Sequence, residues 1–384
     1  MIKPIPYGKQ NITQDDIDAV VDLLKSDFLT QGPTINAFEE AFAKYIGVKY
    51  AVAVANGTAA LHLSNLALGV KPGDKVITTP ITFAASANAT LYCGGSIDFV
   101  DIDPETYLMD LNLLEEKLQS APLGTYKGVV PVDFAGYPID AERLRAIADK
   151  YKLWVLEDAC HAPGGSFKDS QKIDQSCGNG YYADLSIFSF HPVKHIATGE
   201  GGMITTNIKK LYEKLQLLRT HGITKNPELL NENHGGWYYE MQDLGFNYRL
   251  SDIQAALGIS QLKKADKGLK CRREIAQNYN KAFEETAIKT PKIMDGFNHA
   301  YHLYIIQVER RKELYDYLRE HQIFAQVHYI PVHLNPYYKN LGWKKGDFPV
   351  AEVYYEKALS LPMYPSLKAE EQAFVIEKTK EFYL

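Results

Sequence analysis

The sequence predicts an α/β fold in which helices cover both faces of a mostly parallel sheet, followed by a smaller α+β domain. Short apolar runs alternate with helix-length segments, at 51–55, 76–79, 97–102, 129–132 and 153–156. Two further runs, 186–190 and 203–206, bracket a glycine-rich turn. Continuous apolar strands separated by helices are typical of a parallel sheet buried on both faces. Because such sheets bind ligands outside the carboxyl ends of their strands, functional residues are expected just after each run.

Helices are predicted from capping residues and from apolar spacing. Thr13 and Asp16 begin a helix that continues to residue 24, and a second helix runs from Pro33 to Gly47. The remaining helical segments are 58–68, 111–118, 141–151, a long helix over 251–285, 312–321 and 369–382. A strand is expected at 302–308, and the polar stretch 223–236 is expected to be a mobile loop.

The length predicts two domains. A chain of 384 residues is too long for one compact core. We place a large domain, with the N-terminal segment, at 1–255. The long connecting helix and a small C-terminal domain then occupy 256–384.

Composition narrows the possible partners and location. The net charge of −5 excludes a strongly basic nucleic-acid surface. Cys93, Cys160, Cys177 and Cys271 include no C-x-x-C pair, which favours a reducing compartment over a disulfide framework. Met1–Pro4 begins no apolar run of signal-peptide length, and no run approaches the roughly 18 apolar residues of a membrane span. We expect a cytoplasmic protein with no nucleic-acid or membrane partner.

Lys194 is the leading candidate for a catalytic residue. It lies in the turn between the apolar runs 186–190 and 203–206, beside His191, His195 and the Gly199–Gly202 segment. Most lysines are solvated, but this setting favours a buried amine. Desolvation stabilises the neutral amine, which is the form that attacks an aldehyde.

An acidic pair, Glu157 and Asp158, closes the apolar run at 153–156. Asp158 either caps the following turn or faces a ligand, and the residues alone leave both possibilities open. A carboxylate at this edge suits a pyridinium nitrogen, because the anion keeps that nitrogen protonated and the ring electron-withdrawing.

The segment Asn56–Leu61 has the pattern of a strand, a turn containing Gly57, and a helix. Free N–H groups at the helix start, with the Thr58 hydroxyl, would bind a phosphate. Such turns are common, and the segment matches neither G-x-G-x-x-G nor the Walker pattern. Its position is more informative, since phosphate site, carboxylate and lysine occur in the order that an aldehyde cofactor with a phosphate tail requires.

In seven segments the chain resembles the sugar nucleotide aminotransferases, a family of the DegT–StrS type with the fold type I of pyridoxal-phosphate enzymes. The segments are Asn56–Leu61, Thr79–Phe83, Glu157–Ala162, Ser189–Lys194, Gly199–Gly202, Gly245–Leu250 and Val327–Pro331. The resemblance covers nearly the whole chain. It implies an aminotransferase that uses pyridoxal 5′-phosphate and forms a homodimer with shared active sites.

The resemblance also implies roles for individual residues. Lys194 would hold the cofactor as a Schiff base and move the proton, while Asp158 would pair with the ring nitrogen. Phe83 would stack on the ring unless it is a core aromatic, and His161 would lie against the ring or its hydroxyl. The implied phosphate contacts are Gly57, Thr58, Ala59 and Ser189, with Asn247 supplied by the neighbouring subunit.

The substrates that the resemblance implies are L-glutamate as amino donor and a nucleotide-linked keto sugar as acceptor. Ala325–His333 resembles most closely the enzymes of pseudaminic acid synthesis, which aminate C4 of a UDP-linked 4-keto-6-deoxy-N-acetyl-L-hexosamine. Ile5–Tyr7 and Phe28–Pro33 resemble the substrate-contacting edge of the family. The implied substrate contacts are Tyr7, Phe28, Leu29, Thr30, Gln326, His328 and Tyr329.

Two alternatives stay open. The acceptor could be another keto sugar, GDP- or dTDP-linked and aminated at C4 or C3, or the chain could be a regulatory protein that kept the fold without catalysis. His328 and His333 could line the domain interface without a substrate role. Their spacing does not suit a zinc site and no third ligand stands nearby in sequence, so no metal is expected.

Overall fold

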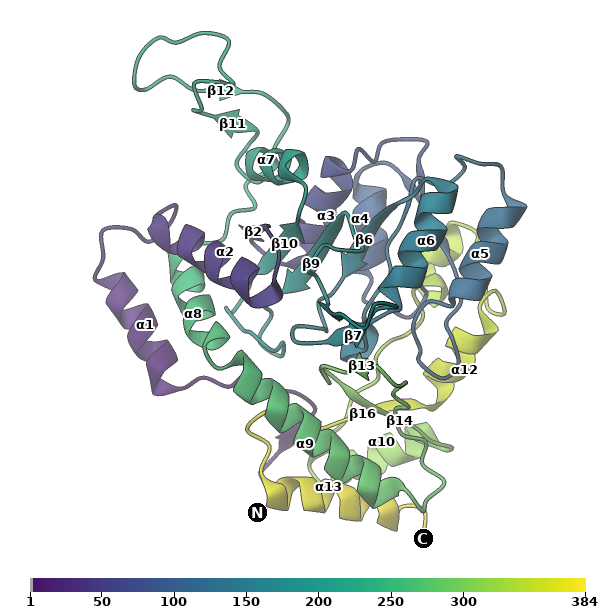
Figure 1. The fold of residues 1–384 in the computed structure, drawn as a ribbon. Helices are drawn as coiled ribbons and strands as arrows, with labels where there is room; N and C mark the ends of the chain where they lie inside the picture. Colours follow the sequence, from purple (N-terminus) through teal and green to yellow (C-terminus); the bar gives the residue numbers. More distant parts are fainter. Residues whose placement is uncertain (1–2) are drawn as a thin grey trace.

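A seven-stranded sheet forms the centre of the larger part of the protein (Figure 1). The structure is a computed structural model that describes residues 3–384. Met1 and Ile2, the first two residues of the Met1–Pro4 segment discussed above, lie outside the described residues. In spatial order the strands are β2 (Tyr50–Val54), β10 (Gly202–Thr206), β9 (Leu185–Ser189), β6 (Trp154–Asp158), β5 (Gly128–Val129), β3 (Lys75–Thr78) and β4 (Ser96–Phe99). β10 runs antiparallel to both neighbours and the other pairings are parallel. The mixed, mostly parallel sheet is confirmed.

Helices lie on both sides of this sheet and in the C-terminal part (Figure 1). They are α1 (Gln14–Leu24), α2 (Pro33–Ile46), α3 (Gly57–Ala67), α4 (Ala85–Tyr92), α5 (Leu111–Ser120), α6 (Ala141–Tyr151), α7 (Lys209–Leu218), α8 (Asp252–Leu262), α9 (Ala265–Phe283), α10 (Arg311–Glu320), α11 (Pro336–Asn340), α12 (Pro349–Lys357) and α13 (Ala369–Glu381). The capping signals behave as predicted. The Thr13 N–H donates to the Asp16 carboxylate at 2.8 Å, and α2 ends at Gly47 with φ of 84°.

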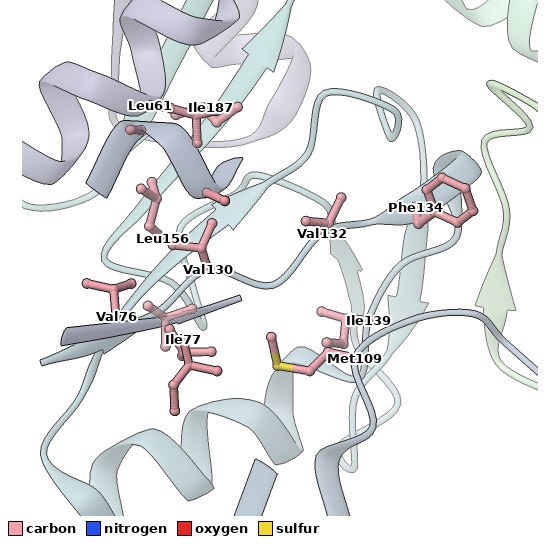
Figure 2. Packing of buried hydrophobic residues seen from close by; sticks show 14 of the residues in the cluster. Leu61, Val76, Ile77, Met109, Val130, Val132, Phe134, Ile139, Leu156 and Ile187 are labelled. Carbon is pink, nitrogen blue, oxygen red and sulfur yellow. The ribbon is translucent and has the colours of Figure 1, made fainter. Parts of the chain in front are cut away.

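The main hydrophobic core joins the sheet to the helices that position the site. Figure 2 shows Leu61 of α3 and Ile187 of β9 at the top of the view, with Leu156 of β6 and Val76 of β3 below them. All four side chains are at most 2% exposed. Because α3 and β6 are fixed by this packing, the residues that begin α3 and end β6 are held rigidly.

The prediction of one long helix over 251–285 is wrong in one respect, because the segment forms two helices, α8 and α9. α8 ends and α9 begins around Lys264, whose φ of −114° and ψ of 9° are not helical. The Lys264 ammonium leaves the helical path to bind the Asp16 carboxylate, the Thr13 hydroxyl at 3.0 Å and the Asn11 carbonyl at 2.9 Å. A buried aspartate far away in sequence therefore sets the break.

The C-terminal part has its own hydrophobic cluster, formed by α9, α10, α13 and short strands. β14 (Tyr304–Gln307) pairs antiparallel with β16 (Ala358–Leu361), which confirms the strand expected at 302–308. The N-terminal strand β1 (Ile5–Pro6) pairs in parallel with β15 (Ile323–Phe324), so the chain start packs against this part. The division into 1–255 and 256–384 stays a prediction.

Peripheral strands complete the fold. β7 (Ser166–Lys168), β8 (Asp174–Ser176) and β13 (Phe297–Asn298) form a small sheet, while β11 (Ile223–Thr224) and β12 (Glu240–Met241) pair at the base of an arm. The arm, which contains the polar stretch 223–236, projects away from the body of the protein (Figure 1). Within residues 3–384, no helix combines the length and apolar character needed to cross a membrane.

Candidate active site

A cavity of about 430 Å³ lies where the central strands end. Its walls come from the segments that follow β2, β3, β6 and β9, closed by residues of the C-terminal part and by Tyr7 from the N-terminus. Of the predicted site residues, the cavity brings together Tyr7, Gly57, Thr58, Phe83, Asp158, His161, Ser189, Lys194, His328 and Tyr329. Residues far apart in sequence thus share one site at the expected edge of the sheet.

Asp158 is the last residue of β6 and is 5% exposed. Its Oδ2 accepts a hydrogen bond from the Ser86 hydroxyl at 2.7 Å, and its Oδ1 accepts from the Cys160 N–H at 3.2 Å. Ser86 is in turn 2.7 Å from the Thr82 hydroxyl. The carboxylate is therefore oriented by two donors and stays at the cavity wall.

The start of α3 forms an anion-binding turn. The Asn56 side chain caps the helix by accepting from the Ala59 N–H at 2.8 Å, while the N–H groups of Gly57 and Thr58 have no intrahelical partner. A Cβ on Gly57 would lie 3.1 Å from the Ser189 Cβ and 3.4 Å from its Oγ. The helix start and the Ser189 hydroxyl thus enclose a space that only glycine leaves open, with the helix dipole favouring an anion.

Lys194 lines the cavity from the turn after β9, where its N–H bonds the His191 carbonyl at 2.9 Å. Burial lowers the pKa of Lys194, although the nearby Cys160 and Asp158 partly oppose this shift. The glycines that follow permit close packing of the return strand, since a Cβ on Gly202 would lie 2.5 Å from the Asn56 carbonyl oxygen. The lysine turn and the anion-binding turn are therefore packed together.

His161 is held as a proton donor toward the cavity. Its Nδ1 accepts from the Ala135 N–H at 3.2 Å, so the neutral ring carries its proton on Nε2. Burial holds the pKa of His161 well below its usual range, which keeps the ring neutral. Nε2 lies 3.4 Å from the Tyr329 hydroxyl.

Aromatic residues form the outer wall. The Tyr329 ring centroid lies 6.1 Å from that of Phe83, and the Tyr7 ring lies 5.0 Å from His328. Phe83 is 62% exposed, so it is not a core aromatic of this chain. His328 is buried, and its Nδ1 forms a hydrogen bond with the Ser360 hydroxyl at 2.9 Å.

Several predicted residues lie outside the cavity. Ala59 is buried behind it, with its N–H used by the cap. The exposed residues away from the cavity are Phe28, Leu29, Thr30, Asn247 and Gln326. Within one chain, these residues do not meet the other site residues.

The structure adds residues that the sequence interpretation did not name. Ser86 orients Asp158 and is itself 2.7 Å from the Thr82 hydroxyl. Thr82 lies in the family segment Thr79–Phe83, whereas Ser86 lies outside these segments and carries no local signal. His302 also lines the cavity, with its ring centroid 4.3 Å from that of His161. No local pattern distinguishes His302 from other buried histidines, so sequence alone could not have found it.

The arrangement fits pyridoxal phosphate. The donor-rich turn suits its phosphate, the oriented carboxylate suits its ring nitrogen, and the partly desolvated amine suits its aldehyde. The fold and the site together define a fold type I aminotransferase.

Comparison with known proteins gives the family. Residues 10–380 match the model of the DegT/DnrJ/EryC1/StrS aminotransferase family. The chain is 41% identical to the spore coat polysaccharide biosynthesis protein SpsC of Bacillus subtilis, over 98% of this chain and 96% of that protein. It is 40% identical to the UDP-4-amino-4,6-dideoxy-N-acetyl-beta-L-altrosamine transaminase of Campylobacter jejuni, over 99% of both.

Solved structures of sugar aminotransferases have the same fold as this chain. The PLP form of the putative sugar aminotransferase Spr1654 from Streptococcus pneumoniae superposes with a TM-score of 0.90 at 30% identity, covering 98% of both chains. Helicobacter pylori PseC, an aminotransferase of pseudaminic acid biosynthesis, gives 0.88 at 32% identity, covering 99% of both. The chain belongs to the DegT/DnrJ/EryC1/StrS aminotransferase family. It is a sugar aminotransferase, and its cofactor is pyridoxal 5′-phosphate.

Proposed function

We propose that the protein moves an amino group from L-glutamate to C4 of a UDP-linked 4-keto-6-deoxy-N-acetyl-L-hexosamine. The observation that carries the catalytic part is the meeting of Lys194, Asp158 and the Gly57–Thr58 turn in one cavity. The sugar is inferred from the names of the Campylobacter and Helicobacter relatives, which match along nearly the full chain.

Each residue then has a defined task. The Gly57 and Thr58 N–H groups and the hydroxyls of Thr58 and Ser189 bind the phosphate. Asp158, oriented by Ser86, would pair with the ring nitrogen. The bound cofactor supplies an electron sink for the carbon that loses its proton.

Lys194 carries the proton. In its neutral form the Lys194 amine would take up the proton that the substrate carbon releases and would later give it back. Burial of Lys194 favours this neutral form. The His161 Nε2–H, 3.4 Å from the Tyr329 hydroxyl, would be available to donate to the ring hydroxyl of the bound cofactor. The same groups serve both halves of a ping-pong reaction, first with glutamate and then with the keto sugar.

A homodimer with shared sites is part of the proposal. Asn247 is exposed and lies in an isolated bridge with Thr220, away from the cavity of its own chain. Phe28 and Leu29 are 53% and 46% exposed, and Trp237 on the arm is 75% exposed. These apolar surfaces support burial against a second copy, which would place Asn247 at the neighbour's phosphate site.

Mixing inactive variants tests the sharing. Homodimers of Lys194→Ala and homodimers of Asn247→Asp are each expected to have little or no transaminase activity. A mixed dimer, formed after mild dissociation, regains one site that combines Lys194 of one subunit with Asn247 of the other. Recovery of activity on mixing supports the arrangement, and its absence despite proven subunit exchange contradicts it.

The substrate is tested directly. Holoenzyme is incubated with glutamate and, separately, UDP-, GDP- and dTDP-linked 4-keto and 3-keto sugars, and the products are identified by mass spectrometry and NMR. Amination at C4 of the UDP-linked L-sugar in preference to the others is the expected result. Preference for a GDP-linked sugar would overturn the assignment, and 34% identity to the GDP-perosamine synthase of Escherichia coli makes this the alternative to include.

The four free cysteines support a cytoplasmic location, because they form no disulfide within residues 3–384.

A further inference from the structure

A pair of buried carboxyl groups, Asp133 and Glu157, lies outside the lining of the cavity. Asp133 is fully buried and Glu157 is 8% exposed. One oxygen of each carboxyl group and the Cys177 sulfur lie within 4.8 Å of one another. Neither carboxyl forms an ion pair with a lysine, arginine or histidine anywhere in the described part of the chain. The family assignment gives this pair no task.

The hydrogen-bond partners favour Glu157 as the ionised member of the pair. The Glu157 oxygens accept from the Ser186 hydroxyl at 2.6 Å and from the Gly178 N–H at 3.1 Å. Asp133 Oδ1 accepts from the Ile139 N–H at 2.9 Å, whereas Oδ2 has no partner if it is a bare carboxylate oxygen. Two adjacent buried carboxylates would repel each other and leave Oδ2 unsatisfied. A proton on Asp133 Oδ2, donated to Glu157, removes both costs.

Asp133 also lies in the segment that holds two site residues. Its N–H donates to the Asp158 carbonyl at 3.1 Å, and the Asp158 N–H donates to the Pro131 carbonyl at 2.9 Å. Two residues later, Ala135 adopts φ of 59° and directs its N–H to His161 Nδ1 at 3.2 Å. The neighbours of Asp133 in sequence, Val132 and Phe134, are anchored in the main core (Figure 2).

We propose that Asp133 is a positioning residue that carries a proton: its acid O–H donates to Glu157 and fixes the 131–136 segment, which holds the Asp158 backbone and the His161 tautomer. Through this segment the pair acts on the cofactor site without touching the cofactor. The proposal holds whichever keto sugar is the substrate.

A metal ion is the alternative occupant of the cluster. Its ligands would be the Asp133 and Glu157 carboxylates and the Cys177 thiolate. However, the hydrogens of Gly178 and Ser186 already point at the Glu157 oxygens that a cation would need. Burial and the nearby carboxyl groups also hold the pKa of the Cys177 thiol well above its usual range, which disfavours a thiolate.

Asp133→Asn is the informative variant. The amide N–H replaces the acid O–H toward Glu157, and the amide oxygen still accepts from Ile139. The groups facing Asp133 that can titrate are Glu157 and Cys177, with Asp158 beyond Glu157. None of them is changed, so a comparison of Asn with Asp isolates one proton.

The sign of the pH effect follows from linkage. Burial, and then the charge of Glu157, hold the pKa of Asp133 well above its ordinary value of 3.8. The folded parent protein therefore keeps a proton that the unfolded chain releases, and the contribution of this proton to the parent's stability declines as pH rises above that ordinary value. The Asn variant has no such proton. Its melting temperature, measured on cofactor-free protein relative to the parent, is expected to rise between about pH 5 and about pH 8.

Two further variants complete the experiment. Asp133→Ala removes both hydrogen bonds and is expected to weaken cofactor binding roughly tenfold or more and to alter the visible band, whereas Asp133→Asn stays within about threefold of the parent. The control is Asp252→Asn. The Asp252 carboxylate accepts from the Gly32 and Thr34 N–H groups at 2.7 and 2.9 Å and faces no second carboxyl, so its variant should be less stable at both pH values.

Three results would overturn the proposal. One is a melting-temperature difference between Asp133→Asn and parent that is flat or falls with pH. Another is a well-folded Asp133→Ala protein with parental cofactor affinity and spectrum. The third is a stoichiometric metal in the purified parent protein that Asp133→Asn loses. Parental cofactor affinity in Asp133→Asn, with the rising difference, supports it.

Discussion

Replacing Asp158 by asparagine should separate the charge at the ring nitrogen from the packing around it. The carboxylate accepts from Ser86 at 2.7 Å and from the Cys160 N–H at 3.2 Å. In the variant, the amide oxygen keeps the Cys160 bond and the amide N–H donates to the Ser86 hydroxyl, which then donates to Thr82, 2.7 Å away. The network can therefore reverse without an unsatisfied group, and the fold should be retained.

The catalytic loss can be estimated from the lost charge. A hydrogen bond that involves a charged group contributes about 1.5–3 kcal/mol, so removal of the anion should lower the rate of the glutamate half-reaction roughly tenfold to hundredfold. The assay is stopped-flow absorbance of the holoenzyme with glutamate, beside thermal unfolding of the same sample. Ser86→Ala is the matched control, because it removes a donor but keeps the charge, and its loss should be smaller. A folded Asp158→Asn protein with the parental rate would refute the role given to Asp158.

Three further predictions concern the phosphate turn, the buried histidines and a buried arginine. Gly57→Ala places a Cβ 3.1 Å from the Ser189 Cβ, so the affinity for the cofactor should fall about tenfold in an equilibrium titration. The cofactor-free variant should keep the parental melting temperature. Unchanged affinity would contradict the assignment of this turn to the phosphate. Burial lowers the pKa of five histidines, three of which line the cavity, so each is neutral in the folded protein. Stability should therefore fall as pH drops below their ordinary value of 6.5. A melting temperature that does not change between about pH 7 and about pH 5 would contradict this. Desolvation lowers the pKa of Arg272 to about 10, and its guanidinium donates to three backbone carbonyls at 2.9–3.2 Å. Arg272→Met should lower the free energy of unfolding by about 3 kcal/mol, as measured in urea. An unchanged free energy of unfolding would show that these bonds contribute little.

The strands and most helices were predictable because their signals are local. Apolar runs marked all seven central strands, and capping residues such as Thr13 and Gly47 marked helix ends. The break at Lys264 was not predictable, since its cause is Asp16, about 250 residues earlier in the chain.

The site residues also divide into those that local sequence motifs predict and those that depend on tertiary contacts. Lys194, Asp158 and Gly57 lie in motifs that follow strands, so the topology of a parallel sheet was enough to bring them together. Ser86, His302 and Asp133 act through tertiary contacts, and their types and spacings do not separate them from ordinary buried polar residues. The predicted contacts Phe28, Leu29, Thr30, Gln326 and Asn247 lie outside the cavity of one chain, and their roles stay predictions that depend on the proposed homodimer.

The covalent attachment of the cofactor to Lys194 is the claim on which the mechanism depends. Borohydride reduction of the yellow holoenzyme, followed by digestion and mass spectrometry, identifies the modified residue. We predict that a single pyridoxyl group is found on Lys194 and that Lys194→Ala carries none. A pyridoxyl group on another lysine, or a reduced protein with no modified lysine, would contradict the account.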